Sequence, residues 1–476
     1  MTDLAPLRLY NSLTRTIEPF TPIRPGEARV YTCGPTVYNY QHIGNMRAFI
    51  FADTLGRALR WAGYDLKHVI NITDVGHLTT DADAGEDKME KAAAGSGRSI
   101  WDIATHYTEA FKRDIRRLNI TEPAQWTVAT DFIPQMIAFA QRIEKDCYLL
   151  DSGLYFDTSR VANYGALARA ATEAGESRID PVSGKRNPQD FAIWRRSPPG
   201  EQRQMEWDSP WGRGAPGWHL ECSVMSEAVL GHPFDIHTGG IDHREIHHPN
   251  EIAQNQSHCA CDDPGANIWM HNNFLVDRRG KMSKSTGEFL TLQSLVDRGV
   301  HPLAFRLMCL QAHYRSELEF TWEGLFAALT RLKRLVQAVE KLRADATEEP
   351  TGDLHVVTVD RAKDAIADDL NTAKPLTFVE LTANAKGAPA DRLAAIVAMD
   401  AILGLRLADI TRADLRIRPT DVVIDEATIA ARLAERKEAR AARDFARSDA
   451  IRDELTSAGV EVMDGDPIGW DWKLTA

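Results

Sequence analysis

Apolar and polar residues follow one another over the first 75 positions in an order that predicts a strand–helix–strand unit. A short apolar strand at residues 28–32 leads through the small-residue turn Cys33-Gly34-Pro35-Thr36 into a stretch, including residues 48–55, where apolar residues recur at helical spacing. A second buried strand is expected at residues 66–74. Two strands joined by one helix predict a right-handed βαβ unit with parallel strands.

The remaining pattern predicts further domains. Helices are expected near 99–118 and 131–146, and residues 150–215 mix short strands with turns. An amphipathic helix at 325–342 precedes more helix at 359–387 and 389–404, with polar connectors at 344–358 and 405–424. We therefore expect an α/β fold whose parts are a Rossmann-like parallel-sheet domain (1–118 and 211–275), an insertion (119–210), a region at 276–324, an α-helical bundle (325–405) and a small C-terminal domain (425–476).

Composition narrows the class of protein. A chain of 476 residues, 43% hydrophobic and 26% charged, predicts a soluble globular protein with two to four domains and no membrane span. The N-terminus lacks the pattern of a signal peptide, and six scattered cysteines do not predict a disulfide framework, so we expect a cytoplasmic location. The net charge of −12 argues against nucleic-acid binding through the whole surface.

Residues near the first turn combine features of a phosphate site and a metal site. A helix start offers unpaired N–H groups and a partial positive charge, to which His42 can add a donor. Cys33, at the strand end, can supply a thiolate to a soft metal. An ordinary β–α turn with a core cysteine fits equally well. Thr73 ends the second strand and is expected at the same edge of the sheet.

A second candidate metal segment lies in the middle of the chain. His247 and Glu251 stand four apart, on one face of a helix, and with Cys33 and Cys222 they would make an acceptable tetrahedral zinc set. Spacing alone does not exclude a polar surface helix. A rival cluster of soft ligands is formed by His258, Cys259 and Cys261.

Each of two basic segments could either bind phosphate groups or be an ordinary solvent-exposed segment. The loop 280–287 carries Lys281 and Lys284, which could close over a triphosphate, although a solvated turn has the same composition. It is not a P-loop. Near the C-terminus, arginines recur every three or four residues along one predicted helix face, which could contact RNA phosphates or could be neutralised by neighbouring acidic residues. They are Arg432, Arg436, Arg440, Arg443 and Arg447.

Several of these segments resemble signatures of class I aminoacyl-tRNA synthetases. His42-Ile43-Gly44-Asn45 matches the "HIGH" element in three of four positions, and Lys281-Met282-Ser283-Lys284-Ser285 matches the "KMSKS" element in full. The combination is far more specific than either part. Other segments resemble the cysteinyl-tRNA synthetases in particular: Cys33-Gly34-Pro35-Thr36-Val37-Tyr38, Asn71-Ile72-Thr73-Asp74, Gly217-Trp218-His219, Glu221-Cys222-Ser223 and Asp235-Ile236-His237. The resemblance covers nearly the whole chain.

The resemblance implies an enzyme that activates L-cysteine with ATP and transfers it to tRNA-Cys. It implies one Zn²⁺ per chain, selecting the substrate thiolate, and Mg²⁺ with ATP. The implied zinc ligands are Cys33, Cys222, His247 and Glu251. The implied cysteine pocket contains Thr73, Trp218 and His237. The implied ATP site contains Gly44, Gly239, Gly240, Asp242 and Lys284, and the catalytic groups are His42, Asn45, Lys281 and Lys284.

The same resemblance assigns functions to the later domains. Residues 276–324 would carry the KMSKS loop and contact the tRNA stem, and residues 425–476 would bind the anticodon side. There the arginine stripe would meet phosphates, while Trp470 and Trp472 would stack on unpaired bases. We expect a monomer.

One departure from the family pattern concerns the nucleotide site. Asn45 replaces the second histidine of the "HIGH" element, so a neutral amide stands where an imidazole could carry charge. Two other interpretations follow. A ligase that joins cysteine to an aminosugar shares the catalytic fold but lacks the anticodon-binding end, and a non-catalytic RNA-binding paralogue would tolerate the loss of a catalytic imidazole.

Overall fold

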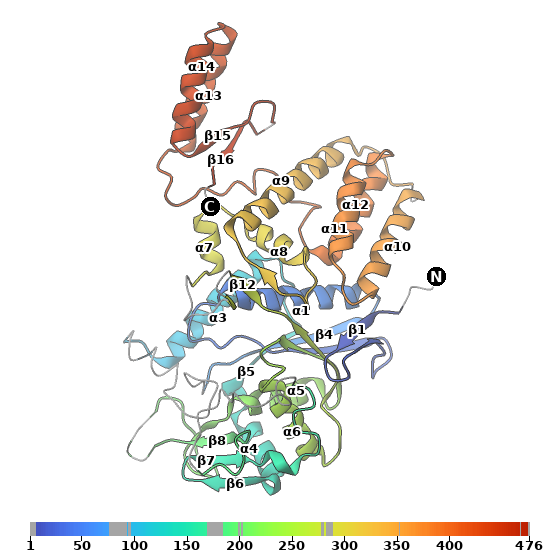
Figure 1. The fold of residues 1–476 in the computed structure, drawn as a ribbon, viewed down its shortest axis with the longest axis vertical. Coiled ribbons are helices and arrows are strands. Elements are labelled where there is room, and N and C mark those ends of the chain that lie inside the picture. Colours follow the sequence, from blue (N-terminus) through green and yellow to red (C-terminus); the bar gives the residue numbers. More distant parts are fainter. Residues whose placement is uncertain are drawn as a thin grey trace.

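The computed structural model describes residues 6–75, 93, 97–168, 184–198, 200, 203–277, 280–281, 289–351, 353–466 and 468–474. Figure 1 shows a central sheet region with the insertion on one side of it and the helical bundle on the other. The C-terminal unit projects beyond the bundle. No helix among the described residues has both the length and the apolar character needed to cross a membrane.

The central sheet has five strands, all parallel, in the order β11-β10-β3-β4-β5. Helices cover such a sheet on both faces, which explains its largely apolar strands. The predicted α/β fold with a parallel sheet is confirmed. The strands are β3 (Glu27–Thr32), β4 (Asp65–Ile72), β5 (Gln125–Val128), β10 (Phe234–Gly240) and β11 (Ala266–Asn272).

Three helices carry or support the residues at the carboxyl edge of this sheet. Helix α1 (Ile43–Trp61) connects β3 to β4, as expected for a βαβ unit. Helix α5 (Trp218–Leu230) precedes β10, and α6 (His247–Cys259) follows it. Two further helices on the way to the insertion are α3 (Ile100–Arg117) and α4 (Ile133–Ile143).

The insertion begins later and ends later than its predicted range of 119–210. Strand β5 pairs in parallel with β4 and so belongs to the central sheet. The insertion's own sheet has four antiparallel strands, which are β6 (Cys147–Leu150), β7 (Gly153–Phe156), β8 (Phe191–Arg196) and β9 (Gly214–Pro216). Turn-rich composition marked the insertion but not its edges, because β5 is as short as the strands that follow it.

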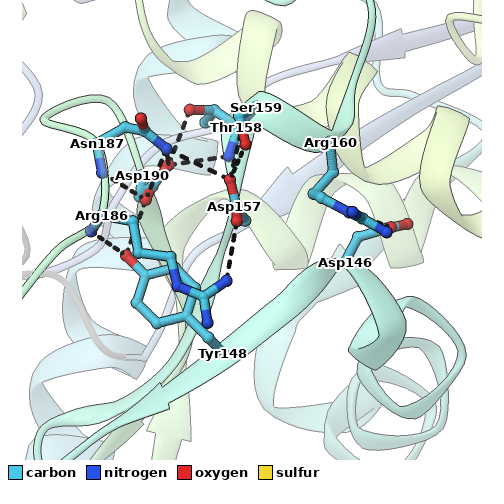
Figure 2. A network of polar contacts seen from close by, with 9 residues as sticks. All are labelled: Asp146, Tyr148, Asp157, Thr158, Ser159, Arg160, Arg186, Asn187 and Asp190. Atoms are coloured by element: carbon cyan, nitrogen blue, oxygen red, sulfur yellow. Dashed lines mark hydrogen bonds and ion pairs between the residues drawn. The ribbon is translucent and has the colours of Figure 1, made fainter.

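A buried polar network holds the insertion together (Figure 2). The carboxylate of Asp190 accepts hydrogen bonds from the Tyr148 hydroxyl (2.8 Å) and from the backbone and side chain of Thr158 (2.9 and 2.8 Å). A buried carboxylate is tolerated when its oxygens are satisfied in this way. Asp146, at the edge of the same network, accepts a 2.6 Å hydrogen bond from Ser257 of α6. The insertion is thereby bonded to the helix that carries His247.

After the central sheet, the chain forms a small three-stranded sheet and two short helices. Its elements are β12 (Leu275–Asp277), β13 (Gly280–Lys281), β14 (Leu318–Glu319), α7 (Leu292–Asp297) and α8 (Pro302–Leu310). Residues 282–287 of the predicted basic loop lie outside the described residues.

The bundle contains four helices, α9 (Trp322–Asp345), α10 (Asp353–Ala367), α11 (Ala373–Asn384) and α12 (Pro389–Leu403). The single helix predicted at 359–387 is two helices, because the backbone at Asp369 and Leu370 has positive φ angles of 55° and 59°. The Asp369 carboxylate accepts hydrogen bonds from the Tyr10 backbone (2.9 Å), the Tyr314 hydroxyl (2.6 Å) and the Arg315 side chain (2.7 Å). Long-range contacts hold this corner against helical propensity.

The N-terminal segment forms a hairpin. Strands β1 (Arg8–Asn11) and β2 (Thr16–Pro19) pair antiparallel. Asn11 then donates to the Asn267 carbonyl on the edge strand β11 of the central sheet (2.9 Å). The hairpin therefore joins the sheet edge to the α10–α11 corner.

The predicted polar connector at 405–424 is packed, not loose. Four of its apolar side chains belong to the main core, namely Leu405, Leu407, Ile410 and Leu415. The C-terminal unit follows as two helices and a hairpin with a small core of its own. Its elements are α13 (Glu426–Ala441), α14 (Phe445–Ser457), β15 (Val460–Val462) and β16 (Trp470–Trp472).

Candidate metal and nucleotide site

Four side chains from three distant segments meet at the carboxyl edge of the central sheet. Cys33 follows β3, Cys222 lies on α5, and His247 and Glu251 share one face of α6. One ligand atom from each lies within 4.8 Å of the others, and all four residues are at most 8% exposed. The two sulfur atoms are 3.9 Å apart. The structure thus brings together the residues that spacing alone left undecided.

The electrostatics of this cluster suit a cation. His247 lies 3.0 Å from one oxygen of Glu251, and His237 lies 2.8 Å from the other. Burial opposes ionisation of Glu251, but the two imidazoles outweigh it and lower its pKa to about 2. The hydrogen bond with Cys33 lowers the pKa of Cys222 to about 6, whereas burial raises that of Cys33. A carboxylate and a thiolate are therefore held ionised in a buried site.

The donor set fits zinc. Two sulfurs, one imidazole nitrogen and one carboxylate oxygen are ligands that Zn²⁺ accepts in tetrahedral geometry. The imidazole of His247 is positioned from behind by His219, whose Nδ1 lies 2.9 Å from that of His247. Such outer contacts orient metal ligands.

A second ligand set overlaps the first. Cys33 and Glu251 also lie within 4.8 Å of ligand atoms of His237 and His248. Nε2 of His248 is 3.3 Å from the Cys33 sulfur, and its Nδ1 is 2.7 Å from Nε2 of His271. Sequence reasoning missed both histidines: helical spacing turns His248 away from the face of His247 and Glu251, and no spacing pattern pointed to His271 on β11. Their signal was the density of histidines between 237 and 271.

A pocket of about 380 Å³ opens from the cluster along the start of α1. His42 caps this helix, because its Nδ1 accepts a 3.2 Å hydrogen bond from the backbone of Asn45. Asn45 itself is exposed on the pocket wall. The wall also includes Cys33, Gly44, Trp218, Gly240 and Asp242. One cavity therefore joins the metal cluster to a helix N-terminus, the arrangement that binds phosphates.

Comparison with known proteins identifies the family. The family model for the tRNA synthetases class I (C) catalytic domain matches residues 19–330. The chain is 67% identical to the cysteine–tRNA ligase of Novosphingobium aromaticivorans, covering 99% of this chain and 97% of the relative. It is 53% identical to that of Zymomonas mobilis, over 98% of each. This chain belongs to the cysteine–tRNA ligase family.

The fold agrees with this membership. The chain superposes on the methionyl-tRNA synthetase of Mycobacterium tuberculosis, solved bound by methionyl-adenylate, with a TM-score of 0.52 at 15% identity. The match covers 80% of this chain and 90% of that one. At this identity the likeness concerns the fold alone.

Two of the three residues expected in the cysteine pocket are not among the residues that line this cavity. Trp218 lines the pocket, but Thr73 and His237 are buried and do not belong to its described wall. Packing also requires glycine at Gly239, which is expected to contact ATP. A Cβ atom there would come within 2.7 Å of His243 and 2.8 Å of His248, so the histidines exclude a side chain.

The basic loop of the family is only partly described. The backbone of Lys281 pairs with Val276 in the β12–β13 hairpin. Lys284 lies outside the described residues. The hairpin nonetheless starts beside the pocket, because Leu275 of β12 is one of the pocket-lining residues.

Most of the arginine stripe is neutralised within the C-terminal unit. Arg436 forms a bidentate pair with Asp464 (2.7 and 2.8 Å), and Arg440 lies 2.9 Å from the same carboxylate. Arg432 and Arg447 both pair with Glu435. Within the described residues, Arg443 alone among the five stripe arginines has no ion pair. Neutralisation by neighbouring acidic residues therefore accounts for most of the stripe.

The expected stacking role of Trp470 and Trp472 is corrected by their burial. They are 7% and 3% exposed and form part of the core of the C-terminal unit. Their rings contact each other edge to face at 4.8 Å. Successive side chains of a strand point to opposite faces, and one face of a short strand is usually exposed to solvent. In β16 the side chains on both faces are buried.

The rival cluster near residue 260 does not form a metal site in the structure. Cys259 and Cys261 are joined by a disulfide at the end of α6. This disulfide differs from the expectation of reduced cysteines. The chain closes on itself there because Ala260 adopts a left-handed conformation with a φ of 53°.

Proposed function

We propose that this chain activates L-cysteine with ATP to form cysteinyl-adenylate and transfers the cysteinyl group to tRNA-Cys. The observation that carries the proposal is the buried cluster of Cys33, Cys222, His247 and Glu251 opening into the pocket at the start of α1. Membership of the cysteine–tRNA ligase family supports it. The proposed site of action is the cytoplasm, and the proposed form is a monomer.

The cluster would hold one Zn²⁺. When bound, the ion would supply a Lewis acid that accepts the thiolate of cysteine as a further ligand. Serine and alanine are close to cysteine in size, and a cavity alone rejects such near-isosteres poorly. Because a neutral hydroxyl is a weaker ligand than a thiolate, the discrimination would rest on one coordinate bond.

The chain's own residues would position ATP for attack by the cysteine carboxylate on the α-phosphate. The N-terminus of α1, capped by His42, would face the phosphates together with Mg²⁺. Asn45 would offer a neutral amide donor, and Lys281 and Lys284 would stabilise the developing charge. No covalent enzyme intermediate is needed, since positioning and charge stabilisation suffice.

Replacing Cys222 by serine tests the proposal directly. Zinc content and cysteine-dependent ATP–pyrophosphate exchange should fall together in purified Cys222→Ser. The matched control is Cys147→Ser, because Cys147 is a free cysteine in β6 outside the cluster. Stoichiometric zinc with normal exchange in Cys222→Ser would show that the ligand assignment is wrong.

The C-terminal unit would contact the anticodon side of tRNA. Arg440 and Arg443 are exposed on α13 and the turn that follows it, so their guanidinium groups can reach a phosphate. Ending the chain after residue 424 should leave pyrophosphate exchange intact and reduce aminoacylation strongly. Unchanged aminoacylation after this truncation would refute the assignment.

A further inference from the structure

One buried carboxylate on strand β16 bonds the C-terminal unit to two other parts of the molecule. Asp471, the middle residue of the strand, is 4% exposed. Its Oδ2 accepts a 2.5 Å hydrogen bond from Lys333 of α9 and a 3.0 Å hydrogen bond from Arg412 of the connector. Bundle, connector and C-terminal unit therefore meet at a single side chain.

Cations from the connector also cover the two tryptophans that flank Asp471. The Arg416 guanidinium lies 3.9 Å from the centre of the Trp470 ring, and that of Arg418 lies 6.0 Å from the centre of Trp472. Cation–π contacts of this kind are attractive, most of all when desolvated. They add to the apolar packing that buries both tryptophans in the core of the C-terminal unit.

The junction is anchored in an apolar core on both of its sides. The connector is anchored in the main core through its four buried apolar residues, Leu405, Leu407, Ile410 and Leu415. On the other side, Trp470 and Trp472 are part of the core of the C-terminal unit. Burial lowers the pKa of Lys333, and the neighbouring Asp471 carboxylate opposes that effect. The Asp471 carboxylate therefore favours the charged form of the Lys333 ammonium group.

We propose that Asp471 is a positioning residue for the transfer of cysteine to tRNA, acting through Lys333 and Arg412. It holds the C-terminal unit at a fixed orientation to the bundle and, through the bundle, to the catalytic pocket. A long RNA that contacts both ends is bound productively only when the two sites have a defined separation and orientation. This inference rests on the proposed function.

Loss of the Asp471 carboxylate should separate β16 from α9 rather than only weaken the contact between them. Removing one partner of a buried ionic cluster leaves the other charges without compensation, which is strongly destabilising locally. In Asp471→Asn, Lys333 and Arg412 would be two buried cations sharing one neutral partner. Separation of β16 from α9 would return both to solvent, so the orientation of the C-terminal unit would no longer be fixed.

The test compares three full-length variants in two activities. In Asp471→Asn and in Lys333→Met, cysteine-dependent pyrophosphate exchange should stay within about twofold of wild type. Their kcat/KM for charging tRNA-Cys should fall by about tenfold or more, mainly in kcat, because the RNA still binds but presents its acceptor end poorly. Small-angle X-ray scattering should show a larger radius of gyration.

The control variant breaks a different ion pair on the same helix. Arg331 of α9 pairs with Glu380 of α11 inside the bundle, at 2.5 and 2.9 Å. Glu380→Gln should therefore leave charging, exchange and the radius of gyration close to those of wild type. An effect on charging equal to that of Asp471→Asn would overturn the specific role of the junction.

The outcomes separate this inference from the proposed function. If wild-type protein shows no cysteine-dependent exchange, the proposed function fails. If wild type charges tRNA and both Asp471→Asn and Lys333→Met charge it equally well, only the positioning role fails. Should Asp471→Asn lose exchange because it does not fold, Lys333→Met decides the question, since a methionine there keeps most of the buried apolar volume.

Discussion

The imidazole of His237 donates a hydrogen bond of 2.8 Å to the Oε2 atom of Glu251. Donation is required because the carboxylate is ionised, its pKa being lowered to about 2 by His237 and His247 against the effect of burial. The His237 ring is in turn stacked on Trp269, with centres 4.5 Å apart. The carboxylate is thus fixed from behind, with its other oxygen turned toward the ligand cluster.

Replacing His237 by alanine should weaken metal binding without removing a ligand of the proposed set. Loss of such an outer contact typically costs ten- to a hundredfold in metal affinity. We expect a decrease of about that size for zinc in a chelator-competition titration. His106→Ala is the control, because His106 is an exposed histidine on α3. Zinc affinity equal to that of wild type in His237→Ala would show that Glu251 does not need this partner.

Asn45 provides a test of the nucleotide end of the pocket. Its side chain is exposed on the pocket wall at the third position of α1. Asn45→Ala should raise the KM for ATP in pyrophosphate exchange several-fold and leave the KM for cysteine nearly unchanged, because only the amide donor near the phosphates is lost. Asn45→His should retain activity. If Asn45→Ala raised the KM for cysteine and left the KM for ATP unchanged, the ATP phosphates would not lie near Asn45.

Acid should destabilise the protein through its buried neutral histidines. Burial lowers the pKa of His68 to about 4, and its Nε2 lies 2.8 Å from the Thr32 hydroxyl. Because the pKa in the unfolded chain is about 6.5, the stabilising contribution is complete above that pH and is lost as pH falls toward 4. The loss for this group reaches about 3 kcal/mol. Urea unfolding between pH 7 and 5 should show a shallower pH dependence in His68→Gln than in wild type.

Asp53 should be one of the most sensitive positions for stability. Its buried carboxylate accepts hydrogen bonds from Arg306 (2.6 Å) and Arg57 (2.7 Å), and Arg306 is fully buried. Asp53→Ala should lower the free energy of unfolding by about 3–5 kcal/mol, because it leaves a buried guanidinium without its counter-charge. Breaking the exposed pair Arg406–Asp409 with Asp409→Ala should cost about 1 kcal/mol or less. Similar losses in the two variants would contradict this assignment.

Local patterns predicted the parallel sheet and the start of α1, but not the long-range contacts. Strands β3 and β4 were visible because both faces of a parallel strand are apolar. The break between α10 and α11 was not visible, because Asp369 is held there by contacts to Tyr10, Tyr314 and Arg315. The spacing of apolar residues along a helix carries no information about contacts with residues hundreds of positions away in the sequence.

Local sequence patterns likewise predicted only part of the candidate site. An i, i+4 pair placed His247 and Glu251 on one face of a helix, which the structure has. Spacing left their grouping with Cys33 and Cys222 undecided, and the family resemblance favoured it, since four ligands from three segments require a known fold. The tryptophans of β16 were misjudged because aromatic residues near a chain end serve equally well as a binding surface or as a small core. The structure buries them in the core of the C-terminal unit, with arginines of the connector near both rings.

The corner at Asp369 has a consequence for the order in which the chain can fold. The backbone of Tyr10 is bonded to a carboxylate 359 positions later in the sequence. A ribosome delivers the N-terminal hairpin first, and domains tend to form as they emerge. This hairpin must therefore remain unattached at that point, with part of its polar backbone open to water, until more than three quarters of the chain has been made. Closing so distant a contact is slow, so we expect attachment of residues 8–11 to be among the last steps of folding.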